Sequence, residues 1–244
     1  MTLPLKRRIE KSLGPLFDPL YLVYLLVDDL RSWRYFPKWF SSFRPRSLVG
    51  EAKPWIPFEA ANWLGHYMKP YMKVFEYGSG GSTIFFAERV TEVISIEHDK
   101  KWHALVTTAL AQRGLTNCTC ELHEPRPIAG TPATPAAPAA PLKIDQSQTS
   151  RFIYDDYYAG TTVHEYVEAI DVQHDHTFDL VLVDGRVRTE CMQHAIPKIR
   201  PGGYLMLDNS NNADVAAMVR KLRQSHSYTG FRGMACLAPM FPSW

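Results

Sequence analysis

The stretch VFEYGSGGST, residues 74–83, decides the fold class of this chain. A hydrophobic run ends at Glu76, a turn with three glycines follows over residues 78–81, and a helical pattern begins at Ser82 or Thr83. Glycine permits a tight turn and lets a ligand approach the backbone, because no Cβ stands in the way. The stretch therefore predicts a strand, a ligand-binding turn and a helix.

This turn departs from two common nucleotide-binding patterns. Dinucleotide-binding turns follow GxGxxG, and here Thr83 stands where the last glycine would be. The Lys-Ser/Thr pair of a phosphate-binding P-loop is also missing after the glycines. The turn disfavours a dinucleotide cofactor and excludes a P-loop.

Strands and helices alternate on either side of this stretch. Short hydrophobic strands separated by helical segments are typical of a parallel sheet covered on both faces. The sequence predicts a Rossmann-like, doubly wound α/β fold with a mainly parallel sheet and helices on both faces. The expected strands are 73–76, 93–97, 118–122, 180–184, 204–207 and a final one at 233–237; the expected helices are 57–68, 82–89, 100–113, 163–172, 188–198 and 212–224.

Two regions differ in character from this alternation. Residues 1–53 are basic and aromatic, and we predict a helical N-terminal extension there, with an amphipathic helix over 16–31. The remainder, 54–244, is one domain, which a Pro/Ala-rich loop interrupts at 125–141. We favour packing of the extension against its own domain or a second subunit; a lid over an acceptor pocket and a membrane-surface contact are the alternatives.

Composition bounds the function. The chain has 244 residues, of which 45% are hydrophobic and 21% charged, and this argues against global disorder. The net charge of +2 demands no polyanionic partner, so we expect no nucleic acid. The four cysteines form no metal-finger spacing, which indicates reduced thiols and a cytoplasmic location. The longest apolar run, residues 19–27, is shorter than the ~20 residues that a membrane span needs.

A second signal is Glu97, at the end of the strand that follows the glycine-rich turn. A carboxylate at this position can accept hydrogen bonds from both hydroxyls of a ribose. After such a turn, Glu97 predicts a nucleoside-bearing cofactor.

Two further motifs are DLVLVDG, residues 179–185, and IRPGGYLMLDN, residues 199–209. With the first two signals they make the chain, over roughly 54–238, resemble class I S-adenosylmethionine-dependent methyltransferases. The resemblance implies a turn that lies under the methionine part of S-adenosylmethionine and a Glu97 that holds its ribose. The cofactor-binding residues that it implies are Glu76, Tyr77, Gly78, Ser79, Gly80, Ser82, Glu97, His98 and Asp184.

The chain is also similar in part to metal-dependent catechol and caffeoyl-coenzyme A O-methyltransferases. Asp184, Asp208 and Asn209 fall on the positions of their metal ligands, which implies a Mg²⁺ site and makes Asp184 and Asp208 the candidate catalytic residues. Residues 185–187 (Gly-Arg-Val) replace the lysine that follows the first acid in the catechol enzymes. The alternative is metal-free: Asp184 or a histidine takes the proton directly, and Asp208 and Asn209 order the loop.

The sequence therefore predicts an S-adenosylmethionine-dependent methyltransferase that acts on a small-molecule acceptor, with O-methylation favoured. Two alternatives stay open. One is an NAD(P)-dependent oxidoreductase, and the other is a non-catalytic protein that has kept the methyltransferase scaffold.

Overall fold

The computed structural model describes residues 30–41, 49–128, 134–135, 158–159, 161–210, 212 and 214–231, which form two compact units. The first, here the sheet unit, comprises Ala52–Pro54 and Met68–Asn209. The second, here the helical unit, comprises the described residues up to Glu51, Trp55–Tyr67, and those from Ser210 on. The domain boundary expected at residue 53 stays a prediction.

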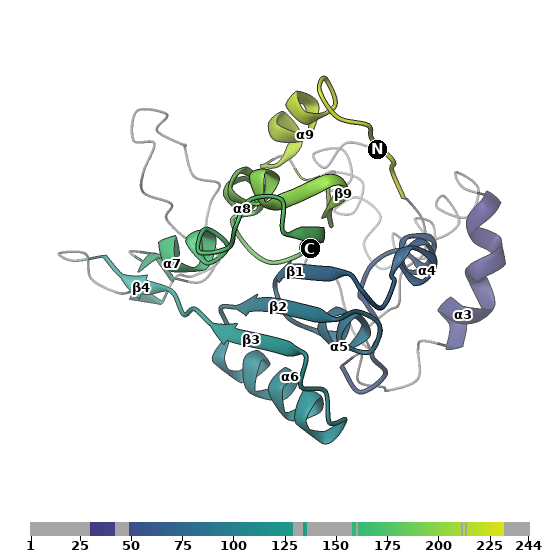
Figure 1. Ribbon diagram of the computed structural model, residues 1–244, viewed down its shortest axis with the longest axis horizontal. Coiled ribbons are helices and arrows are strands. Elements are labelled where there is room, and N and C mark those ends of the chain that lie inside the picture. Colours follow the sequence, from purple (N-terminus) through teal and green to yellow (C-terminus); the bar gives the residue numbers. More distant parts are fainter. Residues whose placement is uncertain are drawn as a thin grey trace, which may run out of the picture. The chain divides into compact units, whose positions relative to one another are not determined.

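The sheet unit is built on five parallel strands in the order β3-β2-β1-β8-β9 (Figure 1). The chain runs outward from β1 through β2 to β3, then returns to the other side of β1 for β8 and β9. Right-handed crossovers in opposite directions place helices on opposite faces of the sheet. The predicted doubly wound, Rossmann-like fold is confirmed. The strands are β1 (Lys73–Tyr77), β2 (Glu92–Glu97), β3 (Cys118–Leu122), β8 (Phe178–Val183) and β9 (Ile199–Leu207).

Burial along these strands follows their place in the sheet. All six residues of β8, a central strand, are buried, as expected for a parallel strand covered on both faces. The edge strand β3 instead alternates between half-buried and exposed residues, because one of its faces is open to solvent. Cys118, Cys120 and Cys191 are free thiols, as predicted; Cys236 lies outside the described residues.

The connecting helices begin and end near the predicted residues. They are α5 (Gly81–Ala87), α6 (Lys100–Gln112), α7 (His164–Glu168), α8 (Arg188–Ala195) and the 3₁₀ helix η3 (Ile196–Lys198). The Asp99 side chain caps α6 by accepting a hydrogen bond from the Trp102 amide (2.8 Å). After α6, Gly114 takes the left-handed conformation, with φ +66°, that commonly ends a helix.

The region predicted as a Pro/Ala-rich loop contains short paired segments. Strand β4 (Arg126–Pro127) pairs with β7 (Thr161–Thr162), and β5 (Thr134–Pro135) pairs with β6 (Tyr158–Ala159), both antiparallel. An extended polyproline-like backbone is close in conformation to a strand, so short stretches of it can pair as strands do. The remainder of 129–157 lies outside the described residues.

The helical unit contains η2 (Leu30–Tyr35), α3 (Phe36–Ser41), α4 (Phe58–Tyr67) and α9 (Ala216–Leu222). The Tyr35 ring stacks on Phe58 with centroids 5.7 Å apart, and Arg34 pairs with Glu59 at 3.0 Å. The helices predicted at 57–68 and 212–224 are confirmed. The strand predicted at 233–237, and all but the last two residues of the helix predicted at 16–31, lie outside the described residues.

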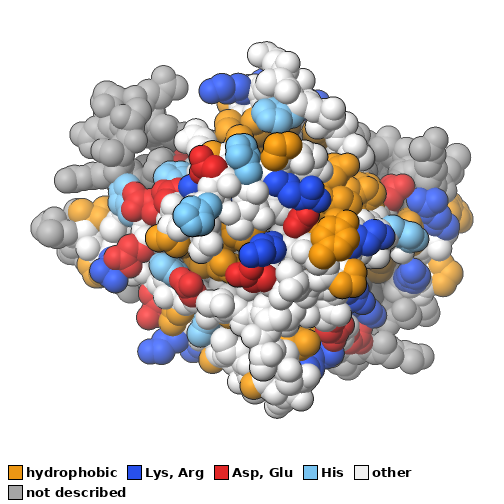
Figure 2. Space-filling model, in the orientation of Figure 1, with side chains coloured by type: hydrophobic (Ala, Val, Ile, Leu, Met, Phe, Trp, Pro, Cys, Tyr) orange, Lys and Arg blue, Asp and Glu red, His pale blue; other side chains and the backbone are white. Residues whose placement is uncertain are grey.

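Charge is mixed on the face of the protein in Figure 2. Basic, acidic and histidine side chains are interspersed among the described residues of that face. Among the described residues, every helix is too short or too polar to span a bilayer.

Candidate functional site

The turn after β1 touches the turn after β8. Gly78 has φ +92°, and a Cβ at this position would lie 2.8 Å from the Gly185 Cα atom. Only glycine allows both this conformation and this approach. The strand order reverses between β1 and β8, so the two turns meet at the point where ligands bind in open α/β sheets.

Glu76 lies at the end of β1 and is fully buried. Its carboxylate accepts hydrogen bonds from the hydroxyls of Ser82, Thr83 (2.5 Å) and Ser95 (2.8 Å). Burial raises the pKa of Glu76 to about 7, against the lowering effect of these hydroxyls. Side-chain hydroxyls from α5 and β2 are thus the donors to the Glu76 carboxylate.

Glu97, at the end of β2, is also buried. Its Oε2 atom accepts from the amide (2.9 Å) and the hydroxyl (2.8 Å) of Ser79, and its Oε1 atom accepts from the amides of His98 (2.8 Å) and Asp99 (2.9 Å). Burial raises the pKa of the Glu97 carboxyl. Hydrogen bonds from His98, Asp99 and Ser79 lower this pKa by more than burial raises it, so the pKa of Glu97 lies below its usual value. The structure thus joins an ionised Glu97 to the glycine-rich turn.

Two aromatic residues that the sequence did not assign to the site also contact these turns. The indole of Trp102 donates to the Ser79 carbonyl (2.5 Å). Tyr166, on α7, is buried against Gly185, where any Cβ would clash with its hydroxyl oxygen. Periodicity marks Tyr166 only as a helix core residue, so the sequence carried no signal for this contact.

The carboxyl ends of β8 and β9 bring two acids and one cation together. Asp184 follows β8 and Asp208 follows β9. Arg188 Nη2 lies 3.3 Å from Asp184 Oδ1, and its Nη1 donates to the Asp208 carbonyl (2.7 Å). Burial and the charge of Asp208 raise the pKa of Asp184, against the effect of Arg188; burial also raises the pKa of Asp208. Together the two acids hold a proton more tightly than ordinary aspartates.

These residues fit a metal ion poorly. The Asn209 amide nitrogen, not its oxygen, faces Asp208 Oδ2 (2.6 Å), and Arg188 supplies the positive charge that a divalent ion would bring. In the described part of the chain, no three His, Cys, Asp or Glu side chains form a metal-binding group. Mg²⁺ ligation by Asp184, Asp208 and Asn209 stays a prediction from the sequence.

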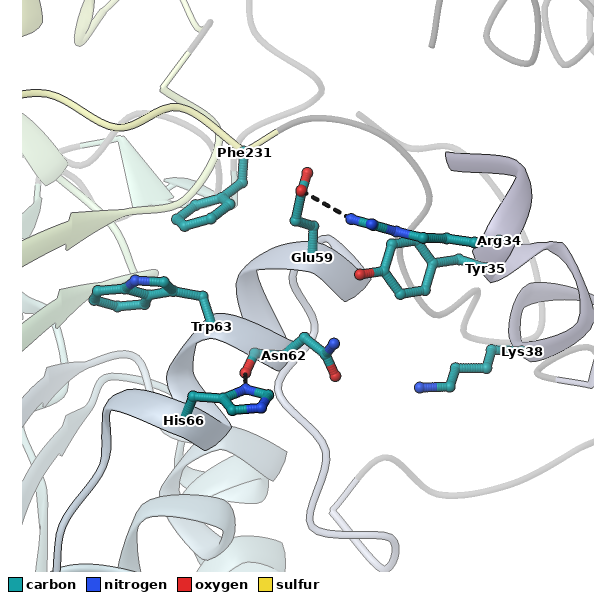
Figure 3. Close-up of a pocket in the computed structure, with 8 residues that line it drawn as sticks. All are labelled: Arg34, Tyr35, Lys38, Glu59, Asn62, Trp63, His66 and Phe231. Atoms are coloured by element: carbon teal, nitrogen blue, oxygen red, sulfur yellow. Dashed lines mark hydrogen bonds and ion pairs between the residues drawn. The ribbon is translucent and has the colours of Figure 1, made fainter. Parts of the chain in front are cut away.

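A pocket of about 410 Å³ lies within the helical unit (Figure 3). Arg34, Tyr35 and Lys38 approach it from one side, and Trp63 and Phe231 from another (Figure 3). Its charges are partly neutralised, because Arg34 pairs with Glu59. None of the predicted site residues lines it.

Comparison with known proteins adds likenesses of fold. No protein-family model matches the chain, and no curated protein matches it. An S-adenosylmethionine-dependent O-methyltransferase from Thermotoga maritima is 14% identical, with 73% of this chain and 56% of that chain covered and a TM-score of 0.46. A precorrin 8w decarboxylase from Methanobacterium thermoautotrophicum is 17% identical (64% of each chain, TM-score 0.41), and a tRNA (m1A58) methyltransferase from Aquifex aeolicus is 12% identical (68% and 51%, TM-score 0.41). The chain spans between half and two thirds of these proteins, and its fold assignment rests on its own strand order.

Proposed function

We propose that this chain is a class I S-adenosylmethionine-dependent methyltransferase. The observation that carries the proposal is the meeting of the glycine-rich turn, Glu97 and the turn after β8 at the switch point of the sheet. A nucleoside cofactor with its ribose on Glu97 would extend from β2 across β1 towards β8. The backbone of Tyr77–Gly80 would line its path, with His98 beside the ribose.

The charge of the site supports a cationic cofactor. Glu76, Glu97, Asp184 and Asp208 surround it, and Arg188 pairs with Asp184. S-adenosylmethionine carries a sulfonium and an ammonium group, which these acids attract. The pyrophosphate of a dinucleotide would be repelled, and this argues against an NAD(P)-dependent oxidoreductase.

The acid pair Asp184–Asp208 would supply the base. S-adenosylmethionine held at this site would supply the methyl group to the acceptor oxygen, with S-adenosylhomocysteine as the leaving group. The proton of the acceptor hydroxyl passes to the ionised carboxylate of the pair, and Arg188 balances the charge. Because the pKa of both acids is raised, the rate should fall as the pH falls through a value above the usual 3.8 of aspartate.

The finer assignments stay proposals as well. A hydroxyl-bearing small molecule is the proposed acceptor, because a carboxylate base suits O-methylation. The cytoplasmic location and the lack of a nucleic-acid partner are inferred from composition alone, and packing of the N-terminal extension on the protein is favoured over a membrane-surface contact.

Titration calorimetry tests the cofactor. S-adenosylhomocysteine should bind, and Glu97→Gln should weaken it at least about tenfold, since a hydrogen bond to a charged group contributes about 1.5–3 kcal/mol. Glu92→Gln is the matched control, because Glu92 lies on the same strand but pairs with Lys73 at the surface. A wild type that binds NADH and ignores S-adenosylhomocysteine contradicts the proposal.

Turnover tests the metal-free base. An acceptor found by screening phenols with methyl-labelled S-adenosylmethionine should be methylated equally in EDTA and in Mg²⁺, whereas Asp208→Asn should lose turnover but still bind S-adenosylhomocysteine. Loss of turnover in EDTA that Mg²⁺ restores would reinstate the metal site. No transfer to any acceptor, with cofactor binding intact, would favour the non-catalytic alternative.

A further inference from the structure

The Tyr166 hydroxyl is a buried polar group without a hydrogen-bond partner. The residue is 1% exposed, and its oxygen has no partner among the described residues. The backbone amide of Arg186 faces the oxygen without completing a hydrogen bond of normal geometry. Even that contact would use a lone pair of the oxygen and leave the hydroxyl proton without an acceptor. A buried hydroxyl in this state destabilises the protein that carries it.

Gly185, which has no side chain, leaves space for the Tyr166 hydroxyl at the switch point of the sheet. The oxygen occupies the space where a side chain at position 185 would begin, and Gly185 itself contacts Gly78. The ring is held from two sides, with centroids 5.5 Å from Tyr77 and 5.8 Å from His98. The hydroxyl proton of Tyr166 therefore lies where the turns after β1 and β8 meet. Both turns have glycine at this point, Gly78 and Gly185.

The missing partner must be an acceptor. Burial, followed by the nearby Cys191 and Glu97, raises the pKa of Tyr166, so the hydroxyl keeps its proton and can donate. In the proposed complex the transferable methyl group must lie near Asp184, and this places the methionine part of the cofactor at β8. Its sulfonium and ammonium groups accept no hydrogen bond, and its carboxylate does.

We propose that Tyr166 is a cofactor-binding residue whose hydroxyl donates a hydrogen bond to the carboxylate of S-adenosylmethionine. This inference rests on the proposed function. It adds a group from α7 to a site that the sequence assigned to the strand ends, the glycine-rich turn and the start of α5. The ligand would supply the hydrogen-bond acceptor that the Tyr166 hydroxyl lacks in the free protein.

Tyr166→Phe should weaken the complex with the cofactor but stabilise the ligand-free protein. The variant should bind S-adenosylmethionine about 10- to 100-fold more weakly, as expected for one hydrogen bond to a charged acceptor. It should bind decarboxylated S-adenosylmethionine, which keeps the ammonium and the sulfonium, as tightly as the wild type does. Without ligand its Tm should rise, because an unsatisfied buried group has been removed.

Tyr71→Phe is the matched control. Tyr71 belongs to the same unit and is 70% exposed, so loss of its hydroxyl should change neither affinity nor Tm. Equal binding of S-adenosylmethionine by Tyr166→Phe and wild type overturns the inference, and so does equal weakening of both ligands. A lower Tm of ligand-free Tyr166→Phe overturns it as well, since it would reveal a partner within the protein. A wild type that binds neither ligand overturns the proposed function, and this inference with it.

Discussion

Glu76 is a buried carboxylate that no described cation neutralises. Three hydroxyls bind it, and burial raises its pKa from 4.5 to about 7. The folded state therefore holds this proton more tightly than the unfolded state does. Glu76 contributes stability that is fully present below pH 4.5 and is lost as the pH rises through about 7.

Glu76→Gln should remove this pH dependence. The difference in the free energy of unfolding between wild type and variant should shift by roughly 3 kcal/mol in favour of the variant between pH 4 and pH 8, since one pKa unit corresponds to about 1.4 kcal/mol. Urea denaturation across this range measures it. An altered hydrogen-bond pattern in the variant would change this difference in the free energy of unfolding by the same amount at every pH. A difference that does not vary with pH would therefore falsify the raised pKa of Glu76.

Tyr77 shows what a satisfied buried hydroxyl does. Its hydroxyl donates to the Val167 carbonyl (2.6 Å) and so ties the end of β1 to α7. Tyr77→Phe removes the donor and should lower the free energy of unfolding by about 1–3 kcal/mol. Urea denaturation should therefore give Tyr77→Phe and Tyr166→Phe opposite signs, although each loses one buried oxygen. Destabilisation of both variants by the same amount would contradict the assigned partners.

The contact between α7 and the turn after β8 depends on the missing side chain of Gly185. A methyl group there would clash with the Tyr166 hydroxyl and would lie 3.1 Å from the Gly78 amide nitrogen. Gly185→Ala should therefore destabilise the protein by several kcal/mol, as overpacking does. Adding Tyr166→Phe should restore part of the loss and not all of it, because the Tyr166 Cζ atom remains 3.1 Å from the added methyl group.

Gly65, within α4, is the control for this substitution. A Cβ there meets nothing within 4 Å, so Gly65→Ala should stabilise the protein by about 0.5–1 kcal/mol through its helix propensity. Thermal denaturation of the single and double variants measures both effects. Tolerance of Gly185→Ala would contradict the close approach of α7 to this turn.

Cofactor binding should stabilise the whole protein by mass action. S-adenosylhomocysteine at about 100 times its Kd should add about 2.7 kcal/mol, which corresponds to a rise in Tm of roughly 5–10 °C for a chain of this size. Circular dichroism at increasing ligand concentration should show the Tm rise with the logarithm of concentration. NADH at the same concentrations should leave the Tm unchanged; a rise with NADH alone would favour the oxidoreductase.

Sequence reasoning suffices for the strands and for the acids at their ends. Apolar runs of five or six residues mark parallel strands, and the carboxyl ends of such strands share one edge of the sheet. This is why the sequence suffices to pair Asp184 with Asp208 and to place the glycine-rich turn beside Glu97. Local patterns carry this information because each strand and turn is a continuous stretch of chain.

The partners of these residues depend on tertiary packing. Glu76 meets hydroxyls of α5 and β2, Arg188 neutralises the acid pair, and Tyr166 reaches Gly185 from α7. Such contacts join side chains whose meeting depends on how helices pack on the sheet, and no periodicity encodes that packing. For the same reason the division into two units could not be read from the sequence.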